Sequence, residues 1–147
     1  MAKQEAIEAI VTGNDQKVGF RALVMKQAIE YNLAGSAKND ANDIVRFTLQ
    51  GDRKRIDSAL ATIQEGTKKS SDIKITTASA AIEPALDTFT IVDWTSSSRN
   101  ITDKYNLVFK LRANDSAISP TDAKAAWHHI LETTLNADDL KKLQRDD

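Results

Sequence analysis

The hydrophobic residues of this chain recur with a period of two in some stretches and of three to four in others. The clearest alternation covers residues 44–50, in which every second residue from Val45 to Leu49 is apolar. Five further segments are also predicted to be strands. These segments are residues 5–12, 35–39, 73–76, 88–94 and 105–111. Helices are expected at about residues 18–32, 53–65 and 120–135, with a short last turn after Asn136.

Residues with special backbone preferences mark the ends of these elements. The first helix is expected to stop before Gly35, because glycine readily ends a helix. Gly51 is expected to break the third strand, and Asp52 to cap the second helix. Asn and Asp at residues 40–43 predict a hairpin turn. The Ser-Pro pair at residues 119–120 predicts the start of the last long helix.

The expected order is strand, helix, strand, strand, helix, strand, which is the split βαβ arrangement of ferredoxin-like α+β folds. Right-handed crossovers make the first two strands parallel, with the third antiparallel between them. Their C-terminal ends therefore lie at one sheet edge, two strand spacings or roughly 10 Å apart. A fifth strand and an additional C-terminal strand and helix complete the expected α/β sandwich. Alternation in the fifth strand places Phe89 and Ile91 opposite to Val92 and Trp94.

Composition limits the classes of partner. The 147 residues carry 20 basic and 21 acidic side chains, so a net charge of −1 gives no global attraction to nucleic acid or anionic lipid. No apolar run reaches the length of a membrane span, and the first residues lack a signal-peptide core. The lack of cysteine excludes disulfides and thiolate metal sites. We expect a cytoplasmic protein without nucleic-acid or membrane partners, and the sequence leaves its oligomeric state open.

The best candidate for a functional site is the segment 11–21, a strand that runs through a tight turn into a helix. The backbone N–H groups of such a turn point into one concavity, and the positive end of the helix dipole faces the same way. Arg21 on the first helical turn adds a permanently charged fork that can bind two oxygens at once. The segment predicts an anion site. The alternative is an ordinary strand-to-helix turn with Arg21 solvated at the surface.

The same segment resembles the signature of the acylphosphatases, V-x-G-x-V-Q-G-V-G-F-R. The residues that match it in register are Val11, Gly13, Gln16, Val18, Gly19, Phe20 and Arg21. Two residues depart from it, since Asp15 stands where the family usually has valine and Lys17 where it has glycine. The resemblance implies that a phosphate is held by the Arg21 guanidinium and by the backbone amides of the turn. These amides belong to Gln16, Lys17, Val18, Gly19, Phe20 and Arg21.

A second motif extends the resemblance. The family carries G-W-V-R-N at the end of its second strand, and here Gly35 and Asn39 match its two ends. The resemblance covers about residues 5–93. It predicts an acylphosphatase-like domain at residues 1–95, with a strand–helix extension at residues 96–147 packed on it.

The resemblance implies a specific reaction, the hydrolysis of acyl phosphates to carboxylate and phosphate. Arg21 and Asn39 would be the catalytic residues, with the Asn39 amide orienting the attacking water. The proposed site contains no serine, cysteine or histidine, so covalent catalysis is not expected. Neither a metal nor a cofactor is implied, and the ligand is an acyl phosphate or inorganic phosphate.

The two departures keep a second hypothesis open. Lys17 must adopt the backbone geometry of a glycine, and Asp15 would repel a phosphate if it faced it. The alternative is a non-catalytic acylphosphatase-like module that binds a small anion or a protein partner. An extension over the Arg21–Asn39 edge would favour this alternative, whereas an extension packed on an edge strand would leave the edge open.

Two polar features are weaker candidates for a site. The loop at residues 95–100 holds serines and an arginine but lacks the glycines of a phosphate loop. His128 and His129 are adjacent on a helix and point about 100° apart, so they cannot both bind one metal. We interpret His128 and His129 as surface residues.

Overall fold

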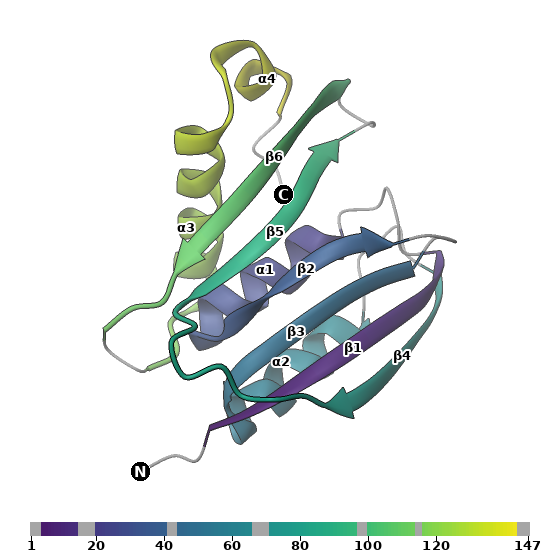
Figure 1. Ribbon diagram of the computed structural model, residues 1–147. Coiled ribbons are helices and arrows are strands. Elements are labelled where there is room, and N and C mark those ends of the chain that lie inside the picture. The colour runs from purple at the N-terminus through teal and green to yellow at the C-terminus, as the bar shows by residue number, and fades with distance from the viewer. Residues whose placement is uncertain are drawn as a thin grey trace.

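The computed structural model describes residues 4–14, 20–40, 44–65, 71–96, 100–113 and 116–143. The strands are β1 (Gln4–Asn14), β2 (Ala34–Asp40), β3 (Ile44–Asp52), β4 (Ser71–Ser79), β5 (Thr88–Ser96) and β6 (Ile101–Lys110). The helices are α1 (Phe20–Tyr31), α2 (Arg53–Glu65), α3 (Pro120–Thr134) and α4 (Ala137–Lys142). Figure 1 shows their arrangement. Each predicted strand and helix is present among these elements.

The described strands form one six-stranded sheet in the order β4-β1-β3-β2-β5-β6. As predicted, β3 lies between β1 and β2 and is antiparallel to both. β5 pairs with β2 in parallel, and β6 pairs with β5 antiparallel. The ferredoxin-like α+β fold is confirmed. Strand β6 of the extension lies beside β5 and continues the same sheet.

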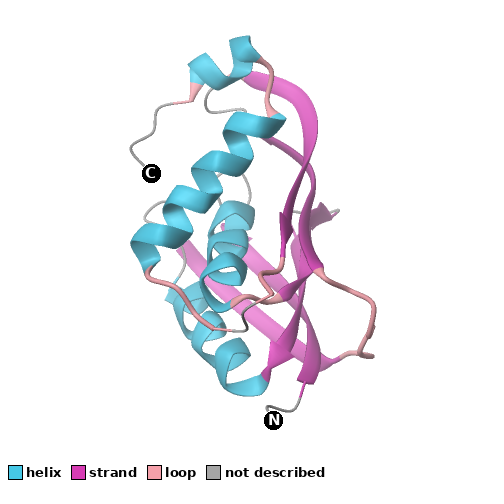
Figure 2. Ribbon diagram, turned by 90° about the vertical axis from the view of Figure 1, so that its left-hand side faces the viewer, coloured by secondary structure: helices cyan, strands magenta, loops and turns pink. Residues whose placement is uncertain are grey.

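The described helices lie on one face of the sheet (Figure 2). The residues that alternate toward this face are buried, such as Val11 on β1 and Phe47 on β3. They pack against the apolar sides of α1 and α2, where Ile29 and Ile56 are fully buried. Each such side chain contributes about 1.5–3 kcal/mol by leaving water. The core therefore lies between the sheet and the helices.

Helix α1 ends at Tyr31, before Gly35 as predicted, but the residue that ends the helix is Asn32. Asn32 takes the left-handed conformation with φ of 56°, and Gly35 lies inside β2. Asn32 also exchanges hydrogen bonds with the backbone of Arg112, whose N–H donates to Asn32 Oδ1 at 2.8 Å. Arg112 Nη1 donates to the Ile29 carbonyl at 2.8 Å, which also accepts a longer bond of 3.4 Å from the Asn32 N–H, and the charge of Arg112 offsets the negative end of the helix dipole. The segment after β6 thus fixes the C-terminal end of α1.

Strand β3 is longer than predicted, because Gly51 and Asp52 do not break it. They pair with Glu5 and Gln4 of β1. The prediction that Asp52 caps α2 holds, because its Oδ2 accepts from the Arg55 N–H at 3.4 Å. The expected hairpin turn at residues 40–43 lies outside the described residues except for Asp40.

Helix α3 forms as the sequence predicts. The Ser119 hydroxyl accepts from the Asp122 N–H at 3.1 Å, and Pro120 occupies the first helical position. Its apolar stripe packs over α1, β5 and β6. The Trp127 ring meets Trp94 of β5 edge to face, with centroids 6.2 Å apart. This aromatic contact ties α3 to the C-terminal half of β5.

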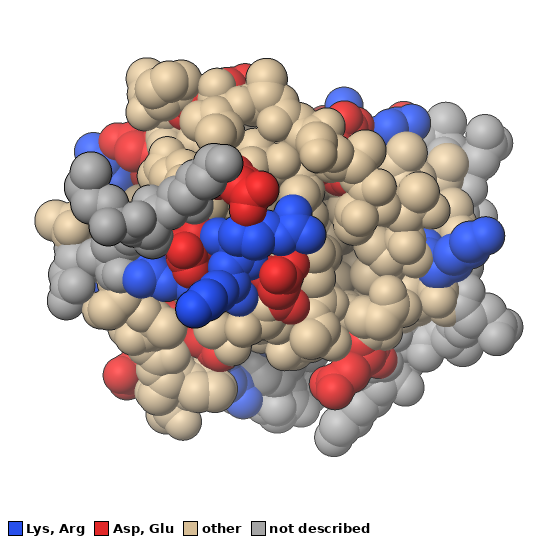
Figure 3. All heavy atoms as spheres, turned by 90° about the horizontal axis from the view of Figure 1, so that it is seen from below, with Lys and Arg blue, Asp and Glu red and all other residues tan. Residues whose placement is uncertain are grey.

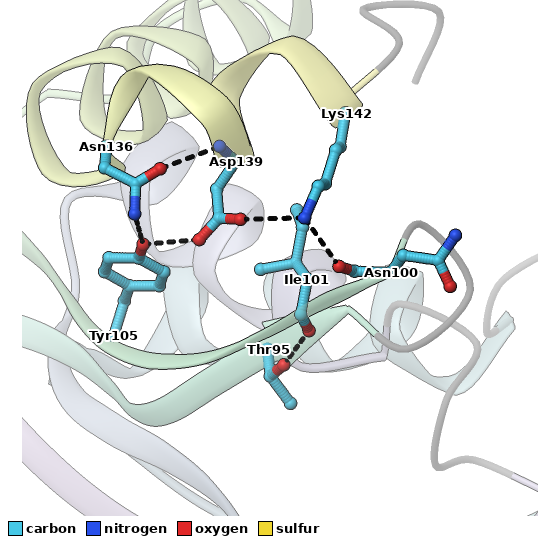
Figure 4. Close-up of polar contacts among 7 residues, drawn as sticks. All are labelled: Thr95, Asn100, Ile101, Tyr105, Asn136, Asp139 and Lys142. Atoms are coloured by element: carbon cyan, nitrogen blue, oxygen red, sulfur yellow. Dashed lines mark hydrogen bonds and ion pairs between the residues drawn. The ribbon is translucent and has the colours of Figure 1, made fainter.

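Helix α4 is joined to β6 by a chain of polar contacts (Figure 4). The Tyr105 hydroxyl donates to Asp139 Oδ2 at 2.5 Å and accepts from Asn136 Nδ2 at 2.9 Å. The Asn136 side chain caps α4, as predicted, by accepting from the Asp139 N–H. Lys142 Nζ then bridges the Asp139 carboxylate and the Asn100 carbonyl. Asp139 is buried, so its charge is balanced by these donors.

The first prediction concerns Gly35. It has φ of +145°, and an added Cβ would lie 1.9 Å from the Thr48 carbonyl oxygen of the neighbouring strand. Gly35→Ala should therefore lower the free energy of unfolding by about 3 kcal/mol, as measured by urea denaturation. Gly51→Ala is the comparison, because Gly51 shares the positive φ, at +157°, but its added Cβ would meet the Leu33 side chain and not a backbone atom, so its loss should be smaller. Equal losses in the two variants would contradict this account of β2.

The second prediction concerns the Tyr105–Asp139 hydrogen bond. This bond and partial burial raise the pKa of the Tyr105 phenol above its ordinary value. Because the pKa is raised on folding, the stabilisation is complete below about pH 10 and is lost as the pH rises through the folded pKa. Urea denaturation between roughly pH 8 and 11.5 should show a steeper alkaline loss of stability in the wild type than in Tyr105→Phe. The other tyrosine, Tyr31, is present in both proteins, so its contribution to the pH dependence is the same in both. Parallel curves for the wild type and Tyr105→Phe would therefore contradict the prediction.

Candidate active site

The C-terminal ends of β1, β2 and β5 lie at one edge of the sheet, because these three strands are parallel to one another. Val45 of β3 pairs with Val11 on one side and with Asn39 on the other. Asn39 is thus level with Val11, near the end of β1, and two strand spacings or roughly 10 Å from it. Asn39 shares the parity of buried Ala37, so it lies on the face that carries the helices, and it is exposed. The end of β1 and the start of α1 lie at this same edge.

Arg21 is on the first turn of α1, and only 9% of it is exposed. Its Nη1 donates to the carbonyl oxygen of Val92 at 3.2 Å and to that of Asp93 at 3.1 Å. Both carbonyls belong to the C-terminal half of β5. Arg21 is therefore not the solvated residue of an ordinary turn. Its guanidinium is held between α1 and β5 at the edge that also carries Asn39.

A β-bulge in β5 provides the two carbonyls. Ile91 pairs with Leu107 and Trp94 with Tyr105, so β5 has one extra residue between these pairs. Asp93 lies in the bulge with φ of +53°, a conformation that aspartate tolerates better than most residues. The bulge also corrects the prediction for Trp94. Trp94 is buried on the helix face together with Ile91, because the extra residue reverses the alternation.

The electrostatics of Arg21 reflect its burial. Loss of water lowers the pKa of the Arg21 guanidinium, and the nearby Asp93 carboxylate opposes this shift. An arginine stays protonated at neutral pH even when it is buried. A permanent positive charge is therefore held in surroundings with little water, where it attracts an anion more strongly than in solvent.

The structure tests the predicted phosphate-binding residues only in part. Residues 15–19 lie outside the described residues, which includes Gln16, Lys17, Val18 and Gly19. Phe20 begins α1 and is buried in the core. Arg21 and Asn39 lie at the same sheet edge, as the predicted topology requires.

Sequence reasoning did not identify the bulge in β5 as part of this region. Val92 and Asp93 act through backbone carbonyls, which any residue possesses. The one usable signal is an aspartate inside a strand pattern, since aspartate is disfavoured in strands and enriched at left-handed positions.

The described residues form neither a metal-binding cluster nor a membrane-spanning helix. They contain no group of three or more histidine, aspartate or glutamate side chains placed to hold a metal ion. None of their helices is long and apolar enough to cross a membrane. Seen from below, a central group of basic side chains is bordered by acidic ones (Figure 3).

Comparison with known proteins adds independent information. A family model described as acylphosphatase matches residues 7–91. The chain is 34% identical to an acylphosphatase from Methanocella arvoryzae over 74 residues, which are 49% of this chain and 84% of that protein. It is 29% identical to an acylphosphatase from Chlorobaculum tepidum over 89 residues, which are 60% of this chain and 97% of that protein.

Solved structures agree with the sequence matches. The crystal structure of acylphosphatase from Bacillus subtilis superposes with a TM-score of 0.52 and 29% sequence identity. The superposition covers 61% of this chain and 99% of that one. The matched part ends on β5, so β6, α3 and α4 follow the region that the family model matches. The chain belongs to the acylphosphatase family.

Proposed function

We propose that this protein hydrolyses acyl phosphates, using Arg21 to bind the phosphoryl group and Asn39 to orient water. The observation that carries the proposal is the buried Arg21 guanidinium, held at the sheet edge that also bears Asn39. Water attacks phosphorus, the bond between phosphorus and the acyl oxygen breaks, and the products are a carboxylate and inorganic phosphate. The oxygen that leaves becomes a carboxylate, which is a stable anion and needs no protonation at neutral pH.

The proposed roles divide between charge and position. The Arg21 guanidinium and the backbone amides of residues 16–21 would bind the phosphoryl oxygens, on which charge accumulates as the bond breaks. The Asn39 side-chain amide would accept a hydrogen bond from the attacking water and hold it in line. Such a mechanism needs neither a metal nor a covalent intermediate. It depends on placing both side chains before the substrate arrives.

The non-catalytic alternative has no support in the described contacts. It rests on Asp15 and Lys17, which lie outside the described residues. An extension that covered the Arg21–Asn39 edge would also have favoured it, but β6 pairs with β5 and α3 packs on α1. We propose residues 1–95 as the acylphosphatase-like domain and residues 96–147 as an extension packed on it. The cytoplasmic location and the lack of a nucleic-acid partner stay predictions from the sequence.

The third prediction tests the activity and both residues. Release of phosphate from acetyl phosphate should be catalysed by the wild type, and Arg21→Ala and Asn39→Ala should each lower kcat/KM by about 100-fold or more. Arg53→Ala is the control, since Arg53 is an exposed arginine on α2 that pairs with Asp57. It should leave turnover unchanged. A folded wild type without turnover above background would contradict the proposal.

A further inference from the structure

The bulge in β5 needs support, because its geometry is unusual and it carries the acceptors for Arg21. A left-handed residue other than glycine persists where the surrounding structure holds it in place. Asp93 is such a residue, and the carbonyl oxygens of Val92 and Asp93 accept both described hydrogen bonds of Arg21 Nη1. The position of Arg21 therefore depends on whatever fixes these two residues.

Strand β6 supplies the first support. Across the bulge, Val92 and Asp93 of β5 face the single residue Asn106 of β6. Asn106 Oδ1 accepts a hydrogen bond from the Asp93 N–H at 3.0 Å. This side-chain bond replaces the strand-to-strand hydrogen bond that a bulge removes. Asn106 is thus joined to Arg21 through one residue, Asp93.

Helix α3 supplies the second support, immediately after the bulge. Trp94 turns to the helix face and packs edge to face on Trp127, with an angle of 75° between the rings. Both rings are buried. The chain on the C-terminal side of Asp93 is therefore anchored in the core.

The other end of the helix that carries Arg21 is also fixed by the extension. Arg112 donates to the Ile29 carbonyl, and its backbone N–H donates to the Asn32 side chain. Helix α1 is thereby held at its C-terminal end by the segment after β6 and at its N-terminal end by the bulge. The residues that support the bulge and the end of α1, which are Asn106, Trp127 and Arg112, all lie beyond the part of the chain that the family model matches.

We propose that the C-terminal extension positions Arg21 for phosphate binding, with Asn106 as the positioning residue. Asn106 stabilises the bulge through its hydrogen bond to the Asp93 N–H. The bulge places two carbonyl oxygens where they accept from Arg21 Nη1. These two hydrogen bonds orient the guanidinium before the ligand binds. A guanidinium that is already oriented loses less freedom on binding and meets the developing charge without reorganisation. The effect on turnover rests on the proposed function, whereas the effect on the Arg21 side chain does not.

The fourth prediction is tested by two measurements on the full chain. Heteronuclear NMR of the isotope-labelled protein should show slow rotation of the Arg21 guanidinium in the wild type and faster rotation in Asn106→Ala. With acetyl phosphate, Asn106→Ala should lower kcat/KM by about 10- to 100-fold and weaken inhibition by inorganic phosphate. Asn106→Asp keeps the acceptor oxygen and should retain slow rotation and most of the turnover.

Lys104→Ala is the control, because Lys104 is an exposed residue of the same strand. It should match the wild type in both measurements. Trp127→Phe weakens the packing on Trp94 and should also make the Arg21 guanidinium rotate faster. If Asn106→Ala does not fold, this variant tests whether the extension positions Arg21. Slow Arg21 rotation in every folded variant would overturn the proposal. A wild type without turnover would overturn the proposed function alone, and the NMR comparison would still decide the role of Asn106.

Discussion

A guanidinium that leaves water must find hydrogen-bond acceptors, and Arg21 finds them in two carbonyl oxygens of β5. A regular strand points successive carbonyls in opposite directions, so one side-chain nitrogen could not reach both. The bulge at Val92 and Asp93 removes this restriction. This contact links α1 to β5 and fixes the position of the positive charge.

The bulge in β5 also explains why the extension packs beside it. In a sheet that ended at β5, the bulge would lie on an exposed edge, with the Asp93 N–H bonded only to water. β6 covers that edge and places Asn106 on the Asp93 N–H, and α3 provides Trp127 for Trp94. The polar chain from Tyr105 through Asp139 to Lys142 then fastens α4 to the start of β6. We therefore regard the extension as part of the support of the proposed site.

Much of this could be predicted from the sequence, and the parts that could not share a physical cause. The spacing of apolar residues indicates which face of a strand or helix is buried. It therefore predicted the described strands and helices, and it predicted that Phe47 and Ile56 would be buried. The family motif led to Arg21 and Asn39. The bulge was not predicted, because it acts through backbone groups and depends on pairing with β6. For this reason the prediction that Trp94 faces away from Ile91 was wrong. The end of α1 was predicted within a residue, but the part that Asn32 plays there was not, because Asn32 is held by the distant Arg112.

The most direct test of the central claim is a crystal structure of the full chain with inorganic phosphate at a saturating concentration. Our account predicts a phosphate at the C-terminal edge of β1 and β2, within about 3 Å of the Arg21 guanidinium and close to Asn39. Arg21 Nη1 should still donate to the carbonyls of Val92 and Asp93. A phosphate bound away from this edge, or an Arg21 side chain that leaves the bulge to reach it, would contradict the account.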